Sequence, residues 1–554
     1  MFKKKLKKNN EILFNVKSNE NFDDLMERPL EKKIYWSYLI IYVLFLVISL
    51  WKLYDYQVLN YEDYKKKSQN NFIKSEVLFS KRGIIVDRND NELVWNEDKE
   101  NEEFSKRKYY KEVGLYHILG FLSYPKKDKW GKYFTKEYSG KAGVEKHFNE
   151  YLNGRLGKKM LKIDAHRNII SQNTIVEPEE GKNLKLTIDL NLQKVLYHAL
   201  SDYIQEDGFI GGAGIIMNAQ TGEILATVSL PEYDSNLMTE KDDAKKMKKY
   251  FTDKRNIFLN RVFLGGYTPG SIVKPFVGLM GLENKIITVN TSFHTTGRLI
   301  LPNKWNPAKP TIFSDWKNHG TVNLFKAIAQ SSNVFFYIVG GGLHGIKNYA
   351  DREGLGISRL YEGYKSFGFG ENTEVERLKE KAGLVPNQEW KKKVFKTNWN
   401  VGNTYFISIG QFGFLTTPLQ VATALSSIVN DGKVLTPRIT FLSKTKVRKT
   451  LPYSQKNINL IKKAMRGTVL RGTTQVLNLD FVQVATKSGT AQIKNNTKNN
   501  AWVEGFWPYK NPKYVFVILG DEGPIKHRSA AVVMRDVFLK LKEEGVEGYF
   551  SEQN

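Results

Sequence analysis

The stretch 269–275 reads Pro-Gly-Ser-Ile-Val-Lys-Pro and places Ser271 three residues before Lys274. On a helix, residues three apart lie on one face, with about 5–6 Å between their Cβ atoms. The lysine amine can therefore accept the serine proton, which is the Ser–Lys route to an acylating nucleophile. The same spacing also occurs at Ser49–Lys52, Ser105–Lys108, Ser123–Lys126, Ser314–Lys317 and Ser443–Lys446. The spacing alone is typical of solvated neighbours, so the surrounding sequence must select the reactive pair.

The local sequence around Ser271 favours this pair. Pro269-Gly270 precedes the serine, so we expect Ser271 to begin a helix and to keep a backbone N–H without an intrahelical partner. Pro275 costs little so near a helix start, because first-turn N–H groups have no acceptor to lose.

Two further motifs follow in order. Residues 331–333 read Ser-Ser-Asn after a helical run over 325–330, where a turn can point Ser331 and Asn333 into a cleft. Residues 487–490 read Lys-Ser-Gly-Thr after an apolar run, as in an edge strand. Gly489 has no Cβ, so we expect it to admit a substrate backbone. Ser-x-x-Lys, Ser-x-Asn and Lys-Ser-Gly together favour one acyl-transfer site.

The pattern of elements predicts an α+β catalytic domain. The runs 213–217 and 223–228 flank a Gly-containing turn and predict a hairpin. The segment 184–188 alternates as a strand, 514–519 resembles a buried strand, and 529–541 has helical periodicity. We therefore expect one antiparallel sheet with helices packed on it.

The region from about Tyr54 to Glu180 is polar and dense in charge. We expect 81–90 to be a strand that enters a polar turn, 92–95 to be the return strand and 142–152 to be a short helix. The segment contains no catalytic constellation, which predicts a non-catalytic module.

Residues 34–51 form an 18-residue stretch without a charge, about the minimum for crossing a bilayer. Aromatic residues flank both ends, as in interfacial belts. Bulky residues follow where a signal peptide would have small ones, so an anchor is favoured over a cleaved signal. Lysines before the span favour a cytoplasmic N-terminus, with everything after Tyr54 outside the cytoplasm.

The composition excludes several classes of site. The 554 residues include no cysteine, which excludes disulfides, thiolate metal sites and cysteine nucleophiles. The net charge of +26 is spread along the chain, so a solvated basic surface is favoured over nucleic-acid binding.

The three motifs resemble those of class B penicillin-binding proteins, the peptidoglycan D,D-transpeptidases. Residues 82–89 resemble the family's pedestal signature, and 187–193 and 221–226 resemble the start of its transpeptidase domain. The segments 383–391 and 408–420 are most similar to the elongation branch, penicillin-binding protein 2.

The resemblance implies an order of domains and a place in the cell. They are a cytoplasmic tail (1–33), a transmembrane anchor (34–53), an elongated pedestal of the dimerisation type (54–180), a β-lactamase-like transpeptidase domain (181–545) and a C-terminal tail (546–554). The protein would be a single-pass protein of the bacterial cytoplasmic (inner) membrane, with its catalytic domain on the periplasmic side.

The resemblance also implies residue roles. Ser271 would attack the penultimate D-alanine of a stem pentapeptide and release the terminal D-alanine. Lys274 would accept the serine proton, Ser331 would relay a proton to the leaving amine, and Asn333 would orient Lys274 and the substrate amide. Lys487 would help to keep Lys274 partly neutral and would bind the terminal carboxylate together with Ser488 and Thr490. The backbone N–H groups of Ser271 and Thr490 would form the oxyanion hole.

The implied partners are the stem pentapeptide, β-lactams, a SEDS-type membrane glycosyltransferase, elongation-complex proteins and the membrane. No cofactor and no nucleic acid are expected. The alternatives are a septal transpeptidase, a penicillin-binding sensor or an inactive scaffold. A β-lactamase is disfavoured, because nothing in the chain identifies a deacylating base.

The chain departs from the family pattern at four positions. Thr486 and Phe412 replace glycines, Asn218 replaces an aspartate, and Ser332 stands where elongation enzymes often have cysteine. Some relatives use that cysteine in a zinc site. Asp315, His319 and His294 are the candidate ligands left here, although we read His319 first as part of a turn before a helix.

Overall fold

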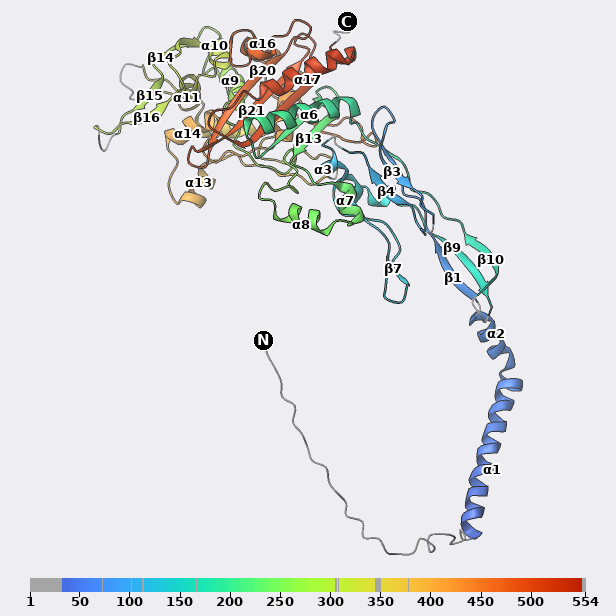
Figure 1. The fold of residues 1–554 in the computed structure, drawn as a ribbon. Coiled ribbons are helices and arrows are strands. Elements are labelled where there is room, and N and C mark those ends of the chain that lie inside the picture. The colour runs from blue at the N-terminus through green and yellow to red at the C-terminus, as the bar shows by residue number, and fades with distance from the viewer. Residues whose placement is uncertain are drawn as a thin grey trace, which may run out of the picture. The chain divides into compact units, whose positions relative to one another are not determined.

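The computed structural model describes residues 32–71, 73–100, 102–111, 114–164, 168–303, 306, 308–343, 350–376 and 378–550. Residues 1–31 and 551–554 of the two predicted tails lie outside this range. Two units are distinguished, with the elements labelled in Figure 1. The first ends at Glu76 and also includes Lys159–Asn173, and the second holds Val77–Lys158 and the chain from Thr174 onward.

The first unit contains one long apolar helix, α1 (Lys32–Tyr54), in which no side chain is buried. Together with the π-helical turn η2 (Asp55–Leu59), it is long and apolar enough to cross a membrane, so the predicted anchor lies within it. The helix α2 (Tyr61–Asn71) follows. Three strands then form a sheet in the order β1-β9-β10: β1 (Ile73–Leu78), β9 (Gly157–Ile163) and β10 (Ile169–Val176).

The second unit begins with a four-stranded sheet in the order β11-β2-β3-β4. Its strands are β2 (Ile85–Val86), β3 (Glu92–Glu97), β4 (Lys106–Tyr109) and β11 (Leu184–Lys185). The predicted helix over 142–152 is instead two short helices, α4 (Gly143–His147) and α5 (Asn149–Leu152). The helix is interrupted at Phe148, whose φ of −108° and ψ of 25° are not helical, and Val144, Phe148 and Leu152 all pack into the core.

Beside this sheet lies a fully buried carboxylate, Glu145. It accepts hydrogen bonds from Arg82 Nε at 2.7 Å and from Arg107 Nε at 2.8 Å. The shared carboxylate offsets part of the cost of burying the two guanidinium groups, and the two ion pairs link Glu145 to both arginines. The Arg-Gly signature at residues 82–83 is therefore part of a buried ion network that holds this module together.

The catalytic part of the second unit is built on a five-stranded antiparallel sheet in the order β13-β12-β22-β21-β20. Its strands are β12 (Gly211–Asn218), β13 (Ile224–Leu230), β20 (Ala485–Ile493), β21 (Lys498–Trp507) and β22 (Tyr514–Gly523). The predicted hairpin and the predicted antiparallel sheet are confirmed, and β20 is an edge strand as expected.

Both faces of this sheet are covered, because successive residues of a strand point to opposite faces. On β22, Phe516 and Ile518 pack with the helices α6 (Leu190–Asp207) and α17 (Ala531–Glu543), which lie across one face in Figure 1. Val515 and Val517 point to the opposite face and join the main core. That second face packs against α15 (Pro418–Val429), and α16 (Gln455–Arg471) packs on the edge strand β20. The helix α9 (Lys274–Glu283) packs on α16 and on α11 (Asn333–Gly341).

The segment 184–188, predicted as one strand of the catalytic domain, changes partners along its length. Leu184 and Lys185 pair in parallel with β2 of the first sheet of this unit, whereas Thr187 N donates to Ile439 O at 2.8 Å. The chain therefore leaves β2 here for the segment 438–440, which lies outside the named strands and pairs with Leu186 through an isolated bridge. The predicted domain boundary at residue 181 stays a prediction.

Candidate active site

Ser271 lies in a tight 3₁₀ turn, η3 (Gly270–Val273), which leads directly into α9 (Lys274–Glu283). Gly270 has a φ of +58° and donates its N–H to Gly410 O at 3.0 Å. A Cβ on Gly410 would lie 2.3 Å from Gly270 O, so only glycine allows this close approach. The Ser-Ile-Gly-Gln segment at 408–411 thus supports η3, which carries the predicted nucleophile Ser271 and is called the nucleophile turn from here on.

The Lys274 amine is fully buried and makes three hydrogen bonds to the 331–333 turn. It donates to Asn333 Oδ1 at 2.7 Å and to Ser331 O at 2.8 Å, and its nitrogen lies 3.2 Å from Ser331 Oγ. A neutral amine has two N–H donors, and the two shortest contacts use both of them. The nitrogen lone pair is then available to a hydroxyl, which is what a general base at this position requires.

The 331–333 turn joins α10 (Leu324–Ala329) to α11 (Asn333–Gly341), as the sequence predicts for a turn after a helical run. Ser331 has a φ of +59°, an uncommon conformation for a residue with a side chain. The Asp315 carboxylate holds this turn, because Oδ2 accepts from Ser332 Oγ at 2.8 Å, Asn333 N at 2.8 Å and Val334 N at 3.0 Å. It acts as a charged cap for α11.

Lys487 reaches the same turn from the edge strand β20. Its side chain is fully buried, and its amine donates to Ser331 Oγ at 3.0 Å and to Ser488 O at 2.6 Å. The Ser331 hydroxyl oxygen therefore accepts from Lys487 and lies 3.2 Å from the Lys274 nitrogen, whose lone pair can accept the Ser331 proton. One serine links the two amines, a geometry that suits proton transfer between them and a reacting group.

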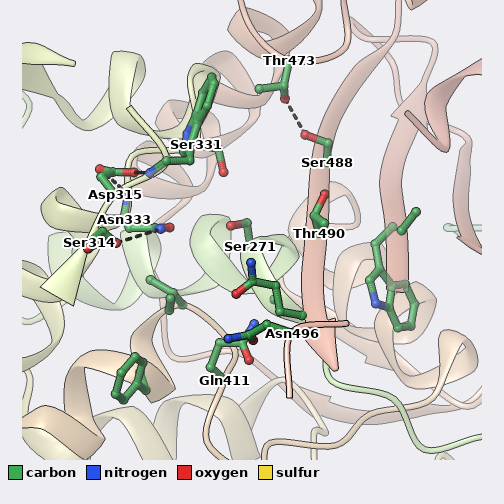
Figure 2. A pocket seen from close by; sticks show the side chains of 18 of the residues that line it. Ser271, Ser314, Asp315, Ser331, Asn333, Gln411, Thr473, Ser488, Thr490 and Asn496 are labelled. Carbon is green, nitrogen blue, oxygen red and sulfur yellow. Dashed lines mark hydrogen bonds between the residues drawn. The ribbon is translucent and has the colours of Figure 1, made fainter. Parts of the chain in front are cut away.

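These elements surround a cavity of about 950 Å³. Figure 2 shows Ser271 between the Ser331–Asn333 turn on one side and Ser488 and Thr490 on the other. Six predicted site residues line the cavity: Ser271, Ser331, Asn333, Ser488, Gly489 and Thr490. The two lysines are buried behind its wall. The structure thus brings all the predicted site residues together.

Burial sets the protonation of the two lysines. It lowers the pKa of Lys274 well below its ordinary value, the charge of Lys487 lowers it further, and Asp315 opposes both. Burial also lowers the pKa of Lys487 to about 7, against the opposing effect of Glu504. An amine with a lowered pKa is available as a base at neutral pH, which an ordinary lysine is not.

Gly489 has a role that the sequence did not indicate. A Cβ at this position would lie 2.9 Å from Ile272 Cγ2 and 3.1 Å from Pro269 O. The missing side chain therefore lets the nucleophile turn pack against the edge strand. The sequence interpretation, room for a substrate backbone, overlooked this contact.

Thr486 fits without disturbing the strand. Its side chain is fully buried, and its hydroxyl shares a 2.5 Å hydrogen bond with Thr474 Oγ1. Gly505 stands directly opposite on β21, and a Cβ there would lie 2.7 Å from Thr486 Cγ2. The missing side chain of Gly505 on the partner strand makes room for Thr486.

Asn218 stabilises the turn between β12 and β13, because its Oδ1 accepts hydrogen bonds from Gln220 N at 2.9 Å and from Thr221 N at 3.2 Å.

Phe412 replaces a glycine at a position that still needs a glycine-like backbone. Its φ is +61°, and its ring lines the cavity. The ring contacts Trp390, Phe395 and Trp399 with centroids 5.7–5.9 Å apart. This aromatic cluster compensates for backbone strain of about 1–2 kcal/mol.

The structure adds residues that the motifs did not identify as part of the site. Thr473 Oγ1 shares a 2.5 Å hydrogen bond with Ser488 Oγ, and Gln411 and Asn496 line the cavity near Ser271 in Figure 2. Asp315 was considered only as a metal ligand. The signal for Gln411 was present in the Ser-Ile-Gly-Gln segment, whereas Thr473 carries no local signature.

The candidate zinc ligands do not make a suitable zinc site. His319 Nε2 lies 3.4 Å from Asp315 Oδ1, but the other Asp315 oxygen is engaged by Ser332 and the start of α11. His294 on β14 (Ser292–Thr295) contacts Thr321 Oγ1 at 3.2 Å. Within the described residues, no group of three or more His, Asp or Glu side chains could hold a metal ion. The expected helix-start turn at His319 is instead the approach to β17 (Gly320–Asn323), which precedes α10.

Known proteins match this chain over most of its length. The family described as penicillin binding protein transpeptidase domain matches residues 212–539, and the penicillin-binding protein dimerisation domain matches residues 100–186. The peptidoglycan D,D-transpeptidase MrdA of Haemophilus influenzae is 32% identical over 489 residues, which cover 80% of this chain and 71% of that protein. MrdA of Escherichia coli K12 is 30% identical over 459 residues, which cover 76% and 68%.

A solved structure has the same architecture. The complex between penicillin-binding protein PBP2 and MreC from Helicobacter pylori matches with a TM-score of 0.71 at 28% identity. The match covers 86% of this chain and all of that chain.

Proposed function

The chain belongs to the penicillin-binding protein transpeptidase family, and we propose that Ser271 is the nucleophile of its peptidoglycan D,D-transpeptidase reaction. The observation that carries the proposal is the Ser331 hydroxyl shared by two buried amines beside Ser271. Lys274, with its lowered pKa, takes the Ser271 proton. Ser271 Oγ then attacks the carbonyl carbon of the penultimate D-alanine of a stem pentapeptide.

The negative charge of the tetrahedral intermediate is held by the backbone N–H groups of Ser271 and Thr490, where one donor is typically worth about 2.7–4 kcal/mol. The intermediate collapses as the bond to the terminal D-alanine breaks, and Ser331 passes a proton to the leaving amine. An acceptor amine of a second stem peptide then attacks the acyl-enzyme. It forms the cross-link and returns Ser271 to its free form.

We propose that hydroxyl groups make the direct contacts with the terminal carboxylate. Ser488, Thr490 and Thr473 line the cavity, whereas the Lys487 amine is buried and engaged by Ser331 and Ser488 O. Lys487 would then attract the carboxylate by its charge from behind the wall. Asn333 would orient both Lys274, which it already contacts, and the substrate amide.

The proposal is tested by labelling the detergent-solubilised protein with a fluorescent penicillin, which mimics the D-Ala-D-Ala end. Ser271→Ala should lose the label, and mass spectrometry of the wild type should place the adduct on Ser271. Ser443→Ala removes a serine with the same spacing to a lysine, at Lys446, and should label normally. Labelling of the Ser271→Ala protein would overturn the assignment.

We further propose the cellular setting and the domain boundaries given by the sequence. The helix α1 anchors the chain in the inner membrane once, with the pedestal (54–180) and the transpeptidase domain (181–545) on the periplasmic side. Alkaline phosphatase fused after residue 60 should be active, and fused before residue 30 inactive. The opposite pattern would reverse the orientation.

The relatives support an elongation role and do not support the septal alternative. We propose that the chain works with a SEDS-type glycosyltransferase and with elongation-complex proteins, because its relative from Helicobacter pylori forms a complex with MreC. Depletion should give rounded cells. Filamentous cells would indicate division instead, and an unchanged wall with intact penicillin labelling would favour a sensor or scaffold.

A further inference from the structure

Glu504 stands directly opposite Lys487 in the ladder between β20 and β21. Directly paired residues of an antiparallel sheet point to the same face, with Cβ atoms about 4.5–5.5 Å apart. Both side chains are fully buried. The Glu504 side chain therefore lies beside that of Lys487, whose amine contacts Ser331, although Glu504 belongs to none of the three catalytic motifs.

Glu504 lacks the hydrogen bonds that normally stabilise a buried carboxyl group. Within the described residues, neither of its carboxyl oxygens has a hydrogen-bond partner. A buried polar group without partners costs about 1–3 kcal/mol, and more when it is charged. An apolar residue would stabilise this position better, so packing does not explain a glutamate here.

Lys487 is the charged group that acts on the pKa of Glu504. The helix α15 (Pro418–Val429), which packs on β21, has no ionisable residue, and Val517 of β22 pairs with Glu504 on its other side. The turn η3 contributes no charge, and Lys274 lies just beyond it. The helix α16 (Gln455–Arg471) packs on β20 and brings Lys462 and Arg466, whose guanidinium donates to Val484 O at 2.8 Å.

The electrostatic effects of the pair are reciprocal. Burial raises the pKa of Glu504 well above its ordinary value, and Lys487 opposes that rise. Burial lowers the pKa of Lys487 to about 7, and Glu504 opposes that fall. An ionised Glu504 and a protonated Lys487 therefore favour each other.

We propose that Glu504 is a positioning residue that holds the proton on Lys487 during acylation. Protonated Lys487 keeps the neighbouring Lys274 amine neutral, so that Lys274 can accept the Ser271 proton, and it presents positive charge to the substrate carboxylate. The inference rests on the proposed roles of Ser271 and Lys274. It adds the group that sets the charge of the second lysine.

The test is the pH profile of the second-order rate of Ser271 acylation by a fluorescent penicillin, measured on the full chain in detergent. Glu504→Gln keeps the shape and removes the charge, so Lys487 should lose its proton at a lower pH. The midpoint of the alkaline limb of the pH profile should fall by about one pH unit in Glu504→Gln. At a pH above the midpoints of both proteins, the variant should therefore be acylated about tenfold more slowly than the wild type. Glu504→Asp keeps the charge and should retain most of the wild-type midpoint.

Two further variants separate charge from structure. Glu522→Gln removes a charge from the adjacent strand, where Glu522 pairs with Lys494, and should leave the midpoint unchanged. Glu504→Leu fills the buried site with an apolar group, so it should shift the midpoint as glutamine does and also raise the unfolding temperature. It serves in place of Glu504→Gln if that protein does not fold. A purely structural role for Glu504 would lower stability without moving the midpoint.

An unshifted midpoint in folded Glu504→Gln or Glu504→Leu, with wild-type protein acylated at Ser271, would overturn this inference alone. An equal shift in Glu522→Gln would also overturn it. Wild-type protein that is not acylated at Ser271 would overturn the proposed function instead.

Discussion

Substituting Gly489 by alanine tests how the nucleophile turn is held. The new Cβ would lie 2.9 Å from Ile272 Cγ2, 3.1 Å from Pro269 O and 3.2 Å from Ile272 N. Favourable contacts between carbon atoms lie near 3.5–4.0 Å, so the turn must retreat from the strand by about 0.5 Å. Two of the three contacts are with backbone atoms, which cannot rotate away. We expect about 1–3 kcal/mol of destabilisation from overpacking.

The larger effect should be on the reaction. Misplacement of a reacting group by about 1 Å can cost about 100-fold in rate, so a shift of about half that should cost roughly tenfold. Stopped-flow acylation with a fluorescent penicillin separates the affinity of the first complex from the rate constant of acylation. The rate constant should fall and the affinity should change little, because the Cβ points at the turn.

Gly467→Ala is a matched control on α16. The nearest atom to its Cβ would be Ala329 Cβ at 3.6 Å, an ordinary contact, so acylation should stay at the wild-type rate. Wild-type acylation by Gly489→Ala would refute the packing argument. A loss of affinity with an unchanged rate constant would favour the first interpretation, that the glycine admits the substrate backbone.

Three other outcomes follow from the site. Asp315→Ala removes the charged cap of α11 and a hydrogen-bond partner of Ser332. The free energy of unfolding, measured with denaturant, should fall by about 1–2 kcal/mol, and the acylation rate should fall at least about tenfold. Acylation at the wild-type rate would contradict this role of Asp315. Phe412→Gly should be about 1 kcal/mol more stable to denaturant than Phe412→Ala. Both variants lose the aromatic ring, but only glycine adopts the positive φ at this position without strain. Equal stabilities of the two variants would show that the backbone is not strained. The second-order acylation rate should fall as the pH rises through about 7, where Lys487 of the free enzyme loses its proton. The acidic limb of the profile should lie at a lower pH, because the pKa of Lys274 is lowered well below its ordinary value. A profile that is flat from pH 6 to 9 would contradict the role of Lys487.

Much of the catalytic part was predictable because its signals are local. The spacing of Ser271 and Lys274, the turn after 325–330 and the strand character of 485–493 each depend on a few neighbouring residues. The long apolar stretch at 34–51 likewise needs no partner to be recognised. A pattern of this kind indicates its helix, turn or strand whatever the rest of the fold is.

The predictions failed where one segment serves two neighbours. The segment 184–188 is not one strand, because its backbone leaves β2 for the strand-like segment near Ile439. The helix over 142–152 is interrupted at Phe148, although Val144, Phe148 and Leu152 recur every four residues, as the apolar face of an unbroken helix would, and all three reach the core. Local periodicity has no information on such changes of partner.

By itself, the sequence predicted Ser271 as the nucleophile and Lys274 as its base, and it determined the order of the three motifs, the long apolar helix and the antiparallel catalytic sheet. Only the tertiary structure decided that Ser331 links two lysines 213 residues apart in sequence, that Asp315 caps α11, and that Glu504 faces Lys487. These contacts depend on strand register and on how helices pack against the sheet. Burial lowers the pKa of both lysines, because their amines are removed from water and the charged form becomes costly. This removal from water happens only in the folded domain, so the sequence alone does not indicate it.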